Sequence, residues 1–130
     1  MLDTDISSYV IKGGMPSVDA RLRAMDIMQV CISAVTRAEL RFGVRRLRSA
    51  TRLATEVERF LSGVQTLAWD ETVADQFAEV RADLERTSTP IGDMDTMIAA
   101  HAKSIRAVLV TNNVKHFRRV RGLTLENWAS

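Results

Sequence analysis

Four short segments of this chain each place an acidic or amide side chain directly beside an apolar run. In chain order they contain Asp3-Thr4-Asp5, Glu39, Asp93-Met94-Asp95 and Asn113. If the apolar runs assemble into one sheet, these side chains meet at one of its edges. Carboxylates that lie close together repel one another, so such a cluster usually needs a divalent cation. The pattern therefore indicates a metal-dependent hydrolase.

The size and composition are typical of one globular domain over residues 1–130, with 46% hydrophobic residues. No apolar run approaches the ~18 residues of a membrane span, and the first residues do not have the pattern of a signal peptide. Cys31 is the one cysteine and lies in an apolar run, so we expect a core residue in a reducing compartment. These features favour the cytoplasm and no membrane.

Alternating apolar runs and helical spacing predict the elements that position the acids. Strands are expected at residues 1–2, 29–33, 64–69, 107–110 and 123–128. Helices are expected at residues 4–12, 36–48, 50–61 and 93–104. Another is expected after a cap at Ser17, with Val18, Leu22 and Met25 facing inward. A further helix is expected from a cap at Asp70 to about residue 86. This alternation predicts an α/β fold with a mostly parallel sheet covered on both faces. In such sheets ligands bind at the carboxyl ends of the strands.

Each acid of the set has a structural explanation beside the catalytic one. Asp3 suits the cap of the following helix as well as it suits a metal ligand. Asp5 lies in the first helical turn and fits a partner of the helix dipole better than a ligand. Glu39 has Gly43 rather than a cation four residues further on, which favours an inward role.

Spacing alone does not choose between Asp93 and Asp95, because one cap is all that the following helix requires. Asp95 lies three residues before Ile98, so its side chain can follow the buried face. Asn113 offers an amide oxygen at a strand end, although Asn-Asn is also typical of a turn.

The histidines and tryptophans do not indicate a site. Neither His101 nor His116 has a Cys or a second His at zinc-ligand spacing, or a convincing nucleophile partner. His101, on a mostly apolar helix, is more typical of a packing residue. Trp69 and Trp128 are more typical of a core or an interface than of base stacking.

Arginine supplies 15 of the 18 cations, although the net charge is only +2. Six arginines gather around and after the Glu39 segment: Arg37, Arg41, Arg45, Arg46, Arg48 and Arg52. The planar guanidinium suits phosphate. The alternative is a solvated helix face with acidic partners, and the cluster gains weight only from its place beside an acidic segment.

Taken together, these segments resemble the PIN-domain ribonucleases, and more closely the VapC toxins of bacterial toxin–antitoxin pairs. The matching segments are MLDTDI at 1–6, ISAVTRAELRFG at 32–43, PIGDMDTMIAAHA at 90–102, LVTNN at 109–113, FRRVRGL at 117–123 and ENW at 126–128. Each alone is a weak signal, but together they occur in family order and span nearly the whole chain. The resemblance implies a PIN-like single α/β domain over residues 1–130.

The resemblance assigns Asp3, Glu39 and Asp95 as the catalytic acids, with Asp3 and Asp95 as metal ligands. Asp95 is preferred to Asp93 because the acid of the family precedes Ile-Ala-Ala by three positions. The role of Asp93 stays open, and it is kept among the supporting polar residues.

Three further positions are expected to support the site. Asn113 stands where many relatives carry a fourth acid, and an amide there lowers the negative charge. Asp5 stands where Asn is common, and Thr111 stands where a hydroxyl orients ligands or water.

The activity that the resemblance implies is endoribonucleolytic hydrolysis of phosphodiester bonds in RNA, with tRNA or ribosomal RNA as expected targets. Mg²⁺ or Mn²⁺ would be the cofactor and would activate water. From charge and location we expect Arg37, Arg41 and Arg45 to hold the RNA backbone. The implied partners are a VapB-type antitoxin that covers the active-site groove and a second copy of the chain. The toxin–antitoxin complex is expected to bind promoter DNA.

Two other functions remain alternatives. A phosphatase of the haloacid dehalogenase type matches Asp3-Thr4-Asp5, Gly92-Asp93 and Val110-Thr111-Asn112, but its hydroxyl motif should precede the Gly-Asp motif. The chain is also short for that fold. A non-catalytic PIN-like module that binds RNA or protein would be favoured by loss of a main acid. All three are present, and the amide at 113 is the one departure in its favour.

Overall fold

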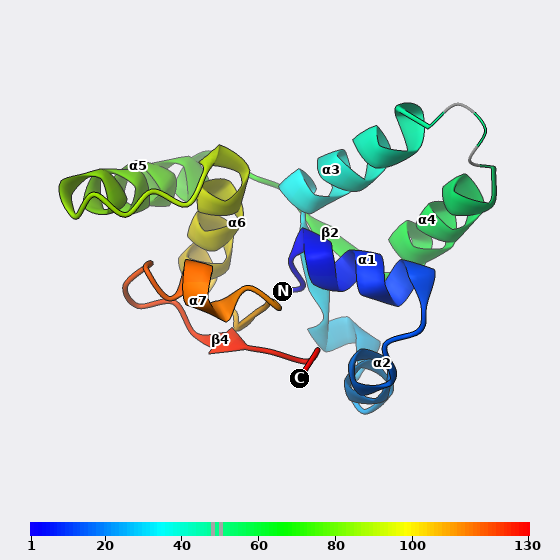
Figure 1. The fold of residues 1–130 in the computed structure, drawn as a ribbon. Coiled ribbons are helices and arrows are strands. Elements are labelled where there is room, and N and C mark those ends of the chain that lie inside the picture. The colour runs from blue at the N-terminus through cyan, green and yellow to red at the C-terminus, as the bar shows by residue number, and fades with distance from the viewer. Residues whose placement is uncertain (48, 50) are drawn as a thin grey trace.

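The computed structural model describes residues 1–47, 49 and 51–130 and arranges them as short strands between two groups of helices (Figure 1). The helices are α1 (Thr4–Lys12), α2 (Pro16–Arg23), α3 (Ala34–Arg45), α4 (Thr51–Gly63), α5 (Glu71–Arg86), α6 (Asp93–Ser104) and α7 (Val114–Phe117). The strands are β1 (Cys31–Ser33), β2 (Gln65–Leu67), β3 (Leu109–Val110) and β4 (Leu125–Glu126). In the described part of the chain, no helix combines the length and apolarity needed to cross a bilayer.

The N-terminal residues join two parallel strand pairs. β1 pairs with β2, and β3 pairs with β4. Between them, Leu2 forms a parallel bridge to Val110, and its backbone N–H donates to Cys31 O at 2.9 Å. Because these pairings are parallel, strand ends of the same kind lie at the same edge. The predicted α/β class with a parallel sheet is confirmed.

Neighbouring strand residues enter opposite cores, as the two-residue period of a strand requires. Met1 and Cys31 lie in one buried cluster, whereas Leu2 and Ile32 lie in the other. The first cluster is covered by α5, α6 and α7, and the second by α1, α2 and α4 (Figure 1). The sheet therefore lies between two apolar layers, and the helices that carry the acids come from both sides.

Some predicted boundaries are wrong for local reasons. Pro16 begins α2, since proline suits the first helical position, and Ser17 is not its cap. Met25 lies beyond α2 and is 39% exposed rather than inward. Asp26 caps a 3-10 turn over Ile27–Gln29, which delays the strand expected from residue 29 until Cys31.

The third helix begins two residues earlier than predicted because Ser33 caps it. Ser33 Oγ accepts a hydrogen bond from the Val35 N–H at 3.1 Å. The helix ends at Arg45. The predicted end and start of the neighbouring helices, Arg48 and Ala50, lie outside the described residues.

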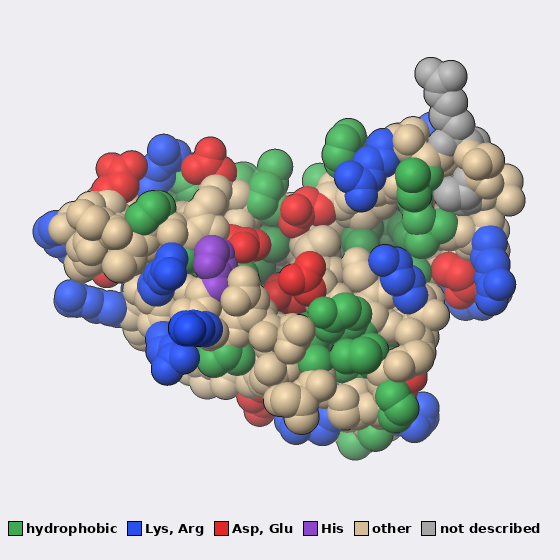
Figure 2. Space-filling model, in the orientation of Figure 1, with side chains coloured by type: hydrophobic (Ala, Val, Ile, Leu, Met, Phe, Trp, Pro, Cys, Tyr) green, Lys and Arg blue, Asp and Glu red, His purple; other side chains and the backbone are tan. Residues whose placement is uncertain are grey.

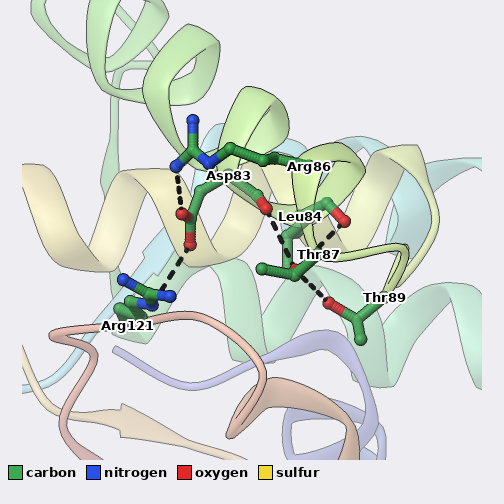
Figure 3. A network of polar contacts seen from close by, with 6 residues as sticks. All are labelled: Asp83, Leu84, Arg86, Thr87, Thr89 and Arg121. Carbon is green, nitrogen blue, oxygen red and sulfur yellow. Dashed lines mark hydrogen bonds and ion pairs between the residues drawn. The ribbon is translucent and has the colours of Figure 1, made fainter.

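A polar network ties the end of α5 to the C-terminal part of the chain (Figure 3). Asp83 forms ion pairs with Arg86 and, at 3.7 Å, with Arg121. Thr87 Oγ1 donates to backbone carbonyls of α5 and lies 2.7 Å from Thr89 Oγ1. Both arginine side chains are largely exposed, so each pair contributes little to stability. The network shapes the turn that leads into α6.

Replacing Ile98 by Ala is expected to lower the free energy of unfolding by about 2–5 kcal/mol, because this α6 side chain is fully buried and its loss leaves a cavity. The matched control is Met94→Ala on the same helix, where the side chain is 52% exposed. We expect the control to stay within about 0.5 kcal/mol of wild type. Urea unfolding measures both, and equal effects would contradict the assigned burial.

Candidate active site

Asp3 is held at the point where the N-terminal segment passes into α1. Its Oδ1 accepts a hydrogen bond from the Ile6 N–H at 2.9 Å, which caps the helix. Its backbone N–H donates to Val110 O at 3.0 Å. The side chain is only 4% exposed. The structural and catalytic explanations therefore do not compete, because the cap itself fixes the carboxylate at the strand ends.

Burial raises the pKa of Asp3 to about 6. Hydrogen bonds from Thr111 and from the Ile6 N–H oppose this rise in the pKa, while the negative charges of Asp5 and Asp95 add to it. These charges act on Asp3 only because the two carboxylates lie close by. The structure thus brings together acids from the first segment and from α6, as the sequence pattern predicted.

Asp95 lies in the first turn of α6, after a glycine that makes the turn possible. Gly92 is the N-cap with φ +90°, a conformation that favours glycine. Burial raises the pKa of Asp95, His116 opposes this rise, and the charge of Asp5 adds to it. Asp93, by contrast, is exposed and forms an ion pair with Arg81 at 3.7 Å. Of these two acids, the structure places Asp95 in the cluster.

Glu39 reaches the same region from α3. Thr4 Oγ1 donates to Glu39 Oε1 at 2.6 Å and lies 3.2 Å from Thr36 Oγ1. Since Thr4 directly follows Asp3, this contact connects the third acid to the first. The half-buried position agrees with the inward role that the sequence favoured.

The supporting residues differ in how close they come to the acids. Thr111 is fully buried and bonds to Asp3, and its Oγ1 also accepts from the Asn113 N–H at 2.9 Å. Asn113 itself is exposed and is the N-cap of α7, without a side-chain capping bond. Asp5 is exposed in the first turn of α1, where its charge acts on Asp3 and Asp95.

Acidic side chains gather at the centre of one face, with Lys and Arg side chains on both sides (Figure 2). A groove of about 650 Å³ begins at Thr4, Glu39 and Met94 and passes between α1, α3 and α4. Its other lining residues are Ser8, Ile11, Lys12, Ala38, Leu40, Phe42, Gly43, Arg46, Leu47, Leu53 and Val57. The groove therefore has an apolar floor, and its lining includes one acid, Glu39, and two cations, Lys12 and Arg46.

The three arginines expected to bind RNA lie on a different part of α3. Arg37 donates to Thr66 Oγ1 at 3.3 Å, and Arg41 forms an ion pair with Glu58. Arg45 lies in a hollow beside that pair. The cations that line the same groove as Glu39 are instead Lys12 and Arg46.

The sequence interpretation missed His116. Its Nε2 lies 2.7 Å from Ile91 O and 3.1 Å from Asp95 Oδ2. No sequence spacing predicts this contact, because His116 and Asp95 are 21 residues apart. His101, by contrast, is the packing residue that was expected, with Nδ1 2.7 Å from Ser33 Oγ and a pKa lowered by burial.

The donor set suits a hard divalent cation. Among the residues that the structure describes, no three His, Cys, Asp or Glu side chains form a ready-made cage for one ion. Mg²⁺ does not need such a cage, because it is usually held by one or two carboxylates, by waters and by substrate phosphates. The raised pKa values of Asp3 and Asp95 show that their negative charges are costly here, and a cation would relieve that cost.

Thr4→Val is expected to lower metal-dependent phosphodiester hydrolysis by roughly 10-fold, a typical loss when a partner that orients a functional carboxylate is removed. The substitution removes the hydroxyl that donates to Glu39 and keeps the shape of the side chain. Thr55→Val, on the exposed face of α4, is the matched control. Wild-type rates in Thr4→Val would show that Glu39 does not depend on this contact.

Comparison with known proteins places the chain and its fold in a family. The profile described as PIN domain matches residues 1–123. The chain is 38% identical over 129 residues to a tRNA(fMet)-specific endonuclease VapC of Shigella flexneri, covering 99% of this chain and 97% of the relative. It is 34% identical to Ribonuclease VapC2 of Rickettsia felis, covering 98% and 96%.

Solved structures agree with the sequence relatives. A DNA-bound VapBC complex from Salmonella typhimurium matches with TM-score 0.93 and 36% identity, covering 98% of this chain and 96% of the matched chain. VapBC2 of Rickettsia felis, bound to a promoter DNA fragment, matches with TM-score 0.90 and 32% identity, covering 98% and 97%. The chain therefore belongs to the PIN-domain family and, within it, to the VapC ribonucleases.

Proposed function

We propose that this chain is the toxin of a type II toxin–antitoxin pair and acts as a metal-dependent endoribonuclease. The observation that carries the proposal is the meeting of Asp3 and Asp95 at the strand ends, where both pKa values are raised. Family membership supports RNA as the substrate, and the name of the Shigella relative favours initiator tRNA over ribosomal RNA. The cytoplasm is the proposed location, since that is where tRNA is found.

In the proposed reaction, Asp3 and Asp95 would hold Mg²⁺ or Mn²⁺, which when bound supplies a Lewis acid beside the phosphate. The cap bond from Ile6 and the bond from Thr111 keep the Asp3 carboxylate in place. Glu39, held at Oε1 by Thr4, accepts the proton of the attacking water. The water oxygen then bonds to phosphorus as the bond to the leaving sugar oxygen breaks, and the leaving oxygen takes up a proton from solvent water.

The direct test is cleavage of total RNA and of initiator tRNA by the purified protein. Reactions would contain Mg²⁺, Mn²⁺ or EDTA, and end-mapping would locate the cut. Discrete products that disappear with EDTA would support the proposal. No cleavage by a folded, metal-binding protein would favour the non-catalytic module, whereas hydrolysis of a small phosphate monoester would favour the phosphatase.

The groove is the proposed binding site for a VapB-type antitoxin. Its apolar floor exposes Phe42 and Leu47, which are 65% and 50% exposed, and suits an amphipathic segment. Lys12 and Arg46 would pair with acidic antitoxin residues. An antitoxin seated there would also cover Glu39. We further propose a homodimer. With the antitoxin, we propose a complex that binds promoter DNA, as VapBC2 of Rickettsia felis does; the Salmonella typhimurium complex is also bound to DNA.

Gly43→Leu is expected to abolish inhibition by the antitoxin while RNA cleavage continues. Gly43 lines the groove, and an added Cβ would meet no atom within 4 Å, so a side chain can start there without a clash and should narrow the groove. Leu also favours a helix more than Gly does. The matched control is Ala78→Leu on the exposed face of α5. Inhibition of Gly43→Leu at wild-type antitoxin concentrations would place the antitoxin elsewhere.

A further inference from the structure

We infer that His116 is a positioning residue for Asp95: its Nε2–H holds Oδ2 of the carboxylate and thereby leaves Oδ1 for the metal. The inference rests on the proposed function. The two distances from Nε2 are 2.7 Å to Ile91 O and 3.1 Å to Asp95 Oδ2. A carbonyl oxygen only accepts hydrogen bonds, so Nε2 carries the proton and donates to Ile91 O, while Asp95 Oδ2 lies within ion-pair distance of the same nitrogen.

The same contact anchors the segment that sets the position of α6. Arg119 Nη1 donates to Pro90 O at 3.0 Å, and His116 donates to Ile91 O, so two successive carbonyls are held from one side. The next residue is Gly92, the N-cap of α6. Only His116 extends this anchor to the carboxylate itself, which distinguishes its role from that of Arg119.

The imidazole ring is itself fixed in place. His116 packs edge-on against Phe117, with ring centroids 5.6 Å apart and an interplanar angle of 89°. Phe117 is 1% exposed in the core between the sheet and α6. The His116 backbone N–H donates to Asn113 O at 3.1 Å. A donor that is held rigidly by buried packing can orient its acceptor, whereas a mobile surface side chain cannot.

The α7 helix has only four residues, and it brings this donor to the site through tertiary packing alone. Asp95 is half-exposed, so without a partner its carboxylate would rotate among several orientations. Loss of the donor should therefore weaken metal binding and slow the chemical step. RNA binding should change little, because the phosphate backbone is recognised mainly by cations.

The test uses three variants of the full chain. His116→Phe keeps an aromatic ring against Phe117 but has no donor. His116→Gln keeps a neutral N–H donor near the position of Nε2. Arg119→Ala removes the neighbouring bond to Pro90 O and leaves the contact with Asp95 intact. Thermal unfolding first establishes that each variant is folded, and calorimetry then measures the Kd for Mn²⁺ in the absence of RNA. Cleavage kinetics give kcat and KM separately.

For His116→Phe we expect a Kd for Mn²⁺ raised about 10–100-fold, a lower kcat and an almost unchanged KM. His116→Gln and Arg119→Ala should bind Mn²⁺ within roughly three-fold of wild type, well inside that range. Wild-type Mn²⁺ affinity in His116→Phe, or an equal loss in Arg119→Ala, would overturn the inference. A wild-type protein that binds no Mn²⁺ would overturn it as well. Mn²⁺ binding that follows this pattern, without RNA cleavage, would uphold the positioning role and refute the proposed nuclease.

Discussion

Asp95→Asn is expected to lower metal-dependent RNA cleavage on the order of 100-fold or more. Removing a residue that merely orients a metal ligand typically costs about 10–100-fold, and loss of a ligand itself should cost at least as much. The amide keeps the size of the side chain but removes the negative charge that, in the proposed function, would hold the cation. Single-turnover cleavage of initiator tRNA in saturating Mg²⁺ or Mn²⁺ measures the effect.

The matched control lies two residues earlier on the same helix. Asp93→Asn makes the same chemical change at an exposed acid whose partner is Arg81. We expect Asp93→Asn to cleave RNA at close to the wild-type rate. Equal losses in the two variants would mean that negative charge at the start of α6 matters in general and that Asp95 has no particular role.

Stability should move in the opposite direction from activity in Asp95→Asn. Burial raises the pKa of Asp95, so the ionised carboxylate destabilises the folded state at neutral pH in the absence of metal. The neutral amide removes this destabilisation. We therefore expect Asp95→Asn to melt at or above the wild-type temperature in EDTA. This result would exclude unfolding as the cause of the lost activity.

The second large effect is a pH dependence of stability that originates at Asp3. Its pKa is raised from 3.8 to about 6 in the folded protein. The folded state thus holds this proton more tightly than the unfolded state does. The contribution of the protonated Asp3 carboxyl to the free energy of unfolding is fully present below pH 3.8 and is lost as the pH rises to about 6. At about 1.4 kcal/mol per pKa unit, the loss is at most about 3 kcal/mol.

Asp3→Asn isolates this contribution, because Asn also caps helices but does not ionise. We expect the unfolding free energies of variant and wild type to be similar near pH 4 in EDTA and to diverge up to pH 7, with the variant more stable. Urea unfolding at intervals of one pH unit measures the difference. A constant difference across this range would show that Asp3 does not have the raised pKa.

Bound metal should reverse the order of stability of the wild type and Asp3→Asn at neutral pH. A cation binds the ionised carboxylate and stabilises the folded state according to its affinity. Added Mg²⁺ or Mn²⁺ should therefore raise the melting temperature of the wild type more at pH 7 than at pH 5, and it should have little effect on Asp3→Asn. Stabilisation of equal size at both pH values would place the bound metal away from Asp3.

Local sequence patterns determined most of the elements, because each pattern reports contacts within a few residues. The helix predicted at 4–12 is α1, and the Asp70 cap is present with its bond to the Val73 N–H at 3.1 Å. The boundaries were predicted wrongly where a residue other than the expected one begins the element, as Pro16 begins α2 in place of a Ser17 cap. The choice of Asp95 over Asp93, which came from the family spacing, agrees with the buried side of α6.

By itself, then, the sequence determined the parallel α/β arrangement, since apolar periodicity carries that information. It also placed acidic segments beside the strands, but the choice among their acids came from the family resemblance. Only the tertiary structure decided what surrounds those acids. In the tertiary structure, Arg41 pairs with Glu58, a groove lies beside Glu39, and His116 contacts Asp95. Each of these contacts joins segments that are distant in sequence, and their geometry depends on how whole helices pack against the sheet.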